Sequence, residues 1–152
     1  MTSKKDLTRF MEAQERDYQA AFAEIKKGRK RSHWMWYIFP QIEGLGFSEI
    51  SRFYAIKDIQ EAESYLRHPV LGSRLIRMCK ELLKQEVSDA NLIFGSPDDM
   101  KLRSCMTLFT SLEGTDAVFQ AVLNKYFGGA KDNKTLSIIA SNGGGGKDVE
   151  AS

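Results

Sequence analysis

Apolar residues recur at intervals of three and four along two segments of this chain, and this spacing strongly constrains its fold. Successive residues of an α-helix turn by about 100°, so such spacing puts apolar side chains on one helical face. No segment alternates β-branched and polar residues as a strand does. We therefore predict an all-α protein without a β-sheet. The two faces consist of Leu7, Phe10, Met11, Gln14, Tyr18, Ala21, Phe22 and Ile25, then of Leu71, Leu75, Met78, Cys79, Leu82 and Leu83.

The three prolines, Pro40, Pro69 and Pro97, mark expected helix boundaries. Proline is tolerated in the first turn of a helix and excluded from its interior. Ser96, followed by two aspartates, is a favourable start for a helix reaching about residue 112. The other predicted helices are residues 7–25, 70–85, 48–54, 58–66, 89–94 (capped by Ser88), a segment capped by Thr115, and 133–140 (capped by Asp132).

These elements fit one domain of about seven helices over residues 1–140. A chain of 152 residues can bury a single core of ordinary size. Four consecutive glycines follow Asn142, so we expect residues 141–152 to form a flexible tail.

Composition excludes several classes of protein. The net charge of +2 does not indicate a nucleic-acid partner. Cys79 and Cys105 have no companions at zinc-ligand spacing, so we expect no metal site and a reducing compartment. No apolar run approaches the ~20 residues of a membrane span, and the N-terminus lacks the apolar core of a signal peptide. We therefore expect a cytoplasmic protein, and without a glycine-rich phosphate loop we expect no cofactor.

The aromatic segment His33–Gln41 is the most distinctive part of the sequence, since it holds both tryptophans. Its aromatic side chains cannot all face one way in a helix. One hypothesis makes them a wedge inside the core. In the other hypothesis a planar ligand such as a nucleobase stacks on Trp34 and Trp36, and Gln41 forms a hydrogen bond with the edge of its ring. Five cations between Lys26 and Arg31 then either cap the preceding helix or bind phosphate.

Three further residues are candidates for ligand binding. His68 precedes Pro69, where it either caps a helix or contributes to a site. Asp99 and Arg103 have the spacing of a surface ion pair on a helix. In the alternative, Asp99 and Lys101 point into a cleft beside the aromatic segment.

Three motifs resemble the bacterial DUF1810 family, whose members are often labelled calpastatin. They read HWMWYIFPQIEGLG, YLRHPVLGSRL and IFGSPDDMKLRSCMTLF, and the likeness runs from about Phe10 to Ile139. This resemblance implies an all-α, single-domain cytoplasmic protein without an established activity. Calpastatin inhibitory regions are disordered and rich in proline, so we do not expect protease inhibition. The positions that match the family motifs are Trp34, Trp36, Phe39, Pro40, Gln41, His68, Pro69, Gly72, Asp99, Lys101, Thr107 and Phe109.

A remoter resemblance is to the NADAR superfamily of proteins that process NAD and ADP-ribose. Glu49 or Ser51 occupies the position of that superfamily's functional glutamate, depending on register. Three hypotheses follow: a binding module for a nucleotide or an ADP-ribose-like molecule, an N-glycosidic hydrolase that uses Glu49, and a helical interaction protein whose aromatic segment is only core. Exposure of the aromatic residues distinguishes them.

Overall fold

The computed structural model describes residues 2–144, and the predicted all-α fold is confirmed for them. They form nine α-helices and one π-helical turn, with no strand. A single parallel bridge joins Ile42 and Ile56. The elements are α1 (Thr2–Lys26), α2 (Met35–Ile38), α3 (Glu49–Tyr54), α4 (Ile59–Arg67), α5 (Leu71–Lys84), α6 (Ala90–Phe94), α7 (Asp98–Thr110), α8 (Val118–Phe127), α9 (Asn133–Ile139) and the π-helical turn Ala140–Gly144.

The predicted number of about seven helices is wrong. Part of the difference is α2, which has only four residues and no side-chain cap. One turn is too short for a 3.6-residue period to be recognised in the sequence. Of the predicted tail, residues 145–152 lie outside the described part of the chain.

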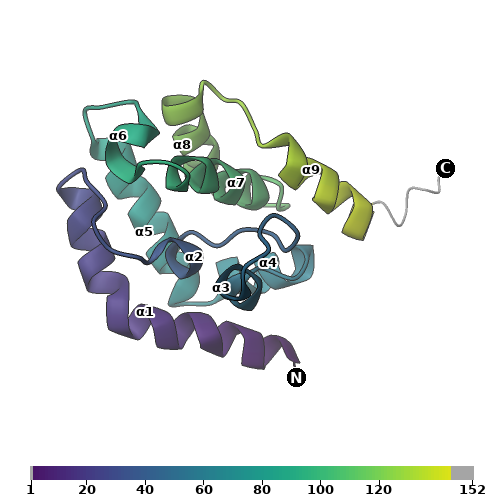
Figure 1. The fold of residues 1–152 in the computed structure, drawn as a ribbon. Coiled ribbons are helices and arrows are strands. Elements are labelled where there is room, and N and C mark those ends of the chain that lie inside the picture. Colours follow the sequence, from purple (N-terminus) through teal and green to yellow (C-terminus); the bar gives the residue numbers. More distant parts are fainter. Residues whose placement is uncertain (1, 145–152) are drawn as a thin grey trace.

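Helix α5 packs against α1, α4 and α8, while α7 packs against α6, α8 and α9 (Figure 1). The predicted apolar faces of α1 and α5 supply much of the core. Phe10, Ala21, Ile25, Leu71, Leu75 and Met78 are fully or almost fully buried. None of the described helices is long and apolar enough to cross a membrane.

The helix starts show where cap predictions succeed. Asp132 caps α9 as predicted, since its Oδ2 accepts hydrogen bonds from the N–H and hydroxyl of Thr135 at 2.9 and 2.6 Å. The predicted caps Ser88 and Thr115 are wrong, because Asp89 caps α6 and Asp116 accepts from the N–H of Val118. In both cases a neighbouring aspartate accepts a hydrogen bond from an N–H group in the first turn of the helix, and capping preferences do not separate adjacent candidates.

Gly72 allows α4 and α5 to approach closely. A Cβ atom at this position would lie 1.9 Å from the carbonyl oxygen of Leu66, deep inside van der Waals contact. Backbone cannot yield as a flexible side chain can. Any side chain at residue 72 would therefore push the two helices apart.

Candidate functional site

The structure separates the two tryptophans of the aromatic segment. Trp34 is 1% exposed, packs against Phe39 and Phe94, and belongs to the core. Its Nε1 donates a hydrogen bond of 2.8 Å to Oε1 of Glu24 on α1. Trp36 is only partly buried and lines a surface cavity. The segment thus contributes one side chain to packing and another to a cavity wall.

This cavity has a volume of about 240 Å³ and lies where four segments meet. Helix α2 contributes Trp36, and the following loop contributes Gln41. The start of α7 contributes Lys101, and the start of α9 contributes Lys134. Its complete lining consists of Trp36, Gln41, Leu45, Gly46, Pro97, Met100, Lys101, Ser104, Asp132 and Lys134.

Gln41 is the unusual member of this lining. It is 8% exposed, and its Nε2 has no hydrogen-bond partner within the described residues. Its backbone is fixed, since its carbonyl oxygen accepts from the N–H of Ile56 at 2.8 Å, and the N–H of Glu43 donates to the carbonyl of Ile56 at 2.8 Å. A buried polar group without a partner costs about 1 to 3 kcal/mol. The amide therefore has unused capacity to donate a hydrogen bond.

A second, smaller cavity adjoins the first, and Trp36 and Gln41 line both. Its volume of about 20 Å³ is just above the roughly 10 to 15 Å³ that one water molecule needs. Ser51 also lines it, and the Ser51 hydroxyl donates to the carbonyl of Ser48 at 2.9 Å. This space has room for a water molecule and is too small for an organic ligand.

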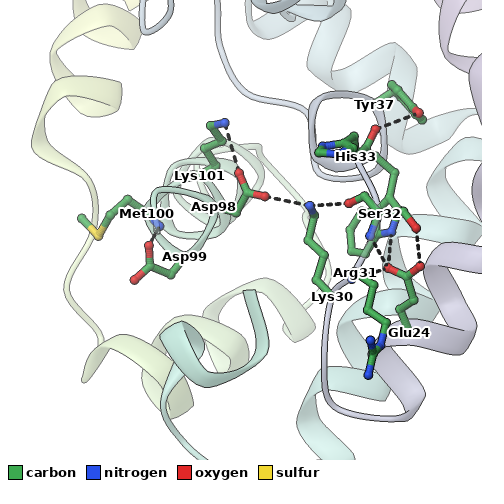
Figure 2. A network of polar contacts seen from close by, with 11 residues as sticks. Glu24, Lys30, Arg31, Ser32, His33, Tyr37, Asp98, Asp99, Met100 and Lys101 are labelled. Carbon is green, nitrogen blue, oxygen red and sulfur yellow. Dashed lines mark hydrogen bonds and ion pairs between the residues drawn. The ribbon is translucent and has the colours of Figure 1, made fainter. Parts of the chain in front are cut away.

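Lys101, which lines the larger cavity, belongs to a group of three charged side chains (Figure 2). The Asp98 carboxylate lies 3.1 Å from Lys101 Nζ and 2.8 Å from Lys30 Nζ. Burial of the carboxyl group acts to raise the pKa of Asp98, but the two lysines outweigh burial and hold it below the ordinary value. One ionised carboxylate is therefore shared by two ammonium groups.

The two lysines each lie over one of the two tryptophans. Lys101 Nζ is 3.9 Å from the ring centre of Trp36, and Lys30 Nζ is 5.0 Å from that of Trp34. Both distances fall within the range of cation–π attraction. Lys30 comes from the predicted cation cluster, whose other members are exposed. The cluster thus contributes one lysine to this part of the molecule.

Glu24 fixes the backbone that carries Lys30 and Trp34 (Figure 2). Its carboxylate accepts hydrogen bonds from the N–H groups of Arg31 and Ser32 at 2.7 and 3.0 Å, and from the Ser32 hydroxyl at 2.6 Å. Burial acts to raise the pKa of Glu24, but these bonds outweigh it and lower the pKa to about 2. The loop between α1 and α2 is therefore held by one carboxylate.

Trp36, Gln41 and Lys101 are the sequence candidates that line the larger cavity. The Nδ1 atom of His68 accepts from the N–H groups of residues 70 and 71 at 3.1 and 3.2 Å, so this side chain caps α5. Asp99 accepts from Asn91 Nδ2 at 3.2 Å and lies outside both cavities.

Glu49 is exposed in the first turn of α3, outside the lining of both cavities. Among residues 7–142, whose side chains the structure describes, no group of three or more His, Cys, Asp and Glu side chains is arranged to hold a metal ion.

Sequence reasoning missed Asp98, Asp132 and Lys134 as neighbours of the cavity. Asp98 and Lys101 are three residues apart, a spacing that brings side chains together on a helix. The same rule paired Asp99 with Arg103, whereas the guanidinium of Arg103 lies 3.9 Å from the carboxylate of Asp132. Spacing alone did not distinguish adjacent aspartates.

Comparisons with known proteins agree with this fold. A family model described as "Protein of unknown function (DUF1810)" matches residues 4–139. The crystal structure of the conserved hypothetical protein Rv1873 from Mycobacterium tuberculosis is similar, with a TM-score of 0.87 and 42% sequence identity over 89% of this chain and 96% of that chain. No curated protein matches the chain. The likeness covers nearly the whole fold and assigns no activity.

Proposed function

This chain belongs to the DUF1810 family of proteins of unknown function, as its three motifs predicted, and we propose that it binds a nucleotide- or ADP-ribose-like small molecule in the larger cavity. The observation that carries the proposal is the buried, unpartnered amide of Gln41 in the cavity wall. Nε2 is itself buried, so a rotation of the amide would bring it to the cavity surface, where a ring nitrogen or carbonyl of a ligand would accept the hydrogen bond that it does not make within the protein.

The position of Trp36 in the cavity wall favours a planar ligand. Stacking of a base on an aromatic side chain contributes about 1 to 3 kcal/mol and tolerates different bases. Lys101 now lies over this ring, but its flexible stem allows the ammonium group to move aside. A ligand ring would stack on Trp36 with its edge directed to Gln41.

The cavity volume limits how much of a ligand it can hold. At about 240 Å³ it is smaller than the roughly 300 to 1,000 Å³ of typical ligand pockets. It would therefore enclose one ring and its nearest substituents. The remainder of a larger molecule, such as the second half of ADP-ribose, would extend past the mouth into solvent.

The other two hypotheses have less support. The carboxylate that lines the cavity belongs to Asp132, which caps α9, and Glu49 is exposed elsewhere, so no observation favours N-glycosidic hydrolysis. Trp34 has the buried position that an interaction protein with an aromatic core would need. Trp36 does not have such a position, and a purely structural role does not account for the buried amide of Gln41 that lacks a partner.

The proposal is tested by ligand titration of the wild type and a Gln41→Leu variant. AMP, ADP, ADP-ribose, NAD and adenosine would be screened by thermal shift and tryptophan fluorescence. Loss of a hydrogen bond worth about 1.5 kcal/mol weakens binding about tenfold. Gln41→Leu should therefore weaken ligand binding about tenfold. The variant should be at least as stable as the wild type, because the substitution removes a buried polar group that has no hydrogen-bond partner.

The control is Gln19→Leu, which changes an exposed glutamine on α1. It should leave ligand affinity unchanged. No response to the whole panel would overturn the proposal. Equal affinities of Gln41→Leu and the wild type would also overturn it, since the Gln41 amide would then serve only an internal water molecule.

A further inference from the structure

We infer that the mouth of this cavity is a phosphate subsite in which Lys101 and Lys134 bind the ligand's phosphate and Asp98 competes with it for Lys101. This inference rests on the proposed function, because it assigns the charged part of the same ligand. It names the ligand class more narrowly, as a phosphorylated form preferred over the nucleoside.

The charges that line the cavity favour an anion. Lys101 and Lys134 are cationic, and Asp132 is the acidic member of the lining. The carboxylate of Asp132 is already engaged, since Oδ2 caps α9 and Oδ1 lies 3.9 Å from the guanidinium of Arg103. The two lysines therefore give the cavity lining an excess of positive charge that Asp132 does not neutralise.

Lys30 and Lys101 differ in their freedom to bind a ligand. The Lys30 side chain is 9% exposed and also donates to the carbonyl of Ser32 at 2.6 Å. The Lys101 side chain is 20% exposed and lines the cavity. Lys101 is thus the lysine of this pair that can turn toward a ligand.

Because Asp98 is shared with Lys30, the Lys101 side chain can turn away from Asp98 toward a ligand at a small cost in free energy. Removing one partner of a buried ion pair is costly when it leaves a charge unpaired. If Lys101 exchanges Asp98 for a phosphate, Asp98 keeps Lys30 at 2.8 Å, and neither charge is left alone. Asp98 nevertheless competes with the ligand, so it sets how strongly Lys101 binds phosphate.

Backbone groups do not explain the same preference. The N–H groups of Asp99, Met100 and Lys101 already donate to the carbonyls of Gly95 and Pro97. An anion near this end of α7 would therefore be held by side chains. This makes the subsite sensitive to single lysine substitutions.

The test measures pyrophosphate and adenosine separately, by calorimetry and thermal shift. Pyrophosphate probes the phosphate subsite without a ring, and adenosine probes the ring site without a phosphate. Lys101→Met should weaken pyrophosphate binding about tenfold, the loss expected for one charge-assisted hydrogen bond, and leave adenosine affinity within a factor of two. Added salt should weaken pyrophosphate binding and not adenosine binding.

Lys80→Met is the control for Lys101→Met, since it removes an exposed lysine of α5, and it should leave pyrophosphate affinity unchanged. Asp98→Asn tests the competing carboxylate and should tighten pyrophosphate binding several-fold. Its control, Glu86→Gln, makes the same change of charge at an exposed position and should not alter pyrophosphate affinity.

The outcomes separate the two proposals. Adenosine binding without any pyrophosphate response would overturn the phosphate subsite and leave the proposed function standing. Equal loss in Lys101→Met and Lys80→Met would also overturn it, because only net charge would then matter. Pyrophosphate binding that depends on Lys101 without binding of adenosine or any nucleotide would support the subsite and overturn the nucleotide assignment.

Discussion

Replacing Glu24 by alanine should destabilise the protein by about 2 to 4 kcal/mol. The largest part comes from Trp34, whose buried Nε1–H would lose its acceptor at a cost of about 1 to 3 kcal/mol. The N–H groups of Arg31 and Ser32 lie at the surface, where water replaces the carboxylate, so their loss adds only about 1 kcal/mol. The helix preference of alanine over glutamate offsets a few tenths of a kcal/mol.

The contribution of Glu24 should also depend on pH. The pKa of its carboxyl group is about 2 in the folded protein and near the ordinary value of 4.5 in the unfolded chain. Because the folded pKa is depressed, the unfolded state takes up a proton first as the pH falls. The stabilisation is complete above pH 4.5 and is lost between pH 4.5 and about 2. A neutral Glu24→Gln variant should therefore approach the wild type in stability below pH 4.5.

Urea denaturation followed by circular dichroism measures both effects. At pH 7 the free energy of unfolding should fall most in Glu24→Ala and less in Glu24→Gln, which keeps an acceptor for Trp34. Glu12→Ala, at an exposed position of the same helix, should change it by less than about 0.5 kcal/mol. At pH 3 the gap between Glu24→Gln and the wild type should narrow. A Glu24→Ala variant as stable as Glu12→Ala, or a gap that widens in acid, would refute the reasoning.

Two other predictions concern packing. Gly72→Ala should destabilise the protein by at least about 2 kcal/mol, because the new Cβ would meet the Leu66 carbonyl. Helix propensity alone predicts the opposite, a gain in stability of about 1 kcal/mol. A raised melting temperature would contradict our prediction. Cys79 and Cys105 are buried, and burial raises the pKa of both thiols, so iodoacetamide at pH 8 should label them only when urea unfolds the protein. Rapid labelling of the native protein would show that the core opens locally.

The fold was predictable where local chemistry decides it. The apolar face of α5 and the cap at Asp132 follow from spacing and from one side chain's preference. The one-turn helix α2 was not predictable in this way, because tertiary packing rather than periodicity maintains so short a helix. Nor could sequence show that Gly72 lies against a carbonyl of another helix.

The site was only partly predictable, because exposure depends on distant segments. The sequence nominated Trp34 and Trp36 together, and only the fold shows that α1 and α6 cover the first while the second lines a cavity. The preference for Asp99 over Asp98 was likewise undecidable from spacing. Asp98 contacts Lys30, a residue far away in sequence whose position depends on the loop that Glu24 holds.

The parallel bridge between Ile42 and Ile56 makes the intervening segment, including α3, a nearly closed lobe. Both ends of this lobe are tied to each other by backbone hydrogen bonds. Its interior is also tied to the rest of the protein, because Tyr54 packs against Phe10 and Tyr37. Leu45 and Gly46 of the same lobe line the cavity. A change of sequence within the lobe would therefore act on the cavity wall and on the core together.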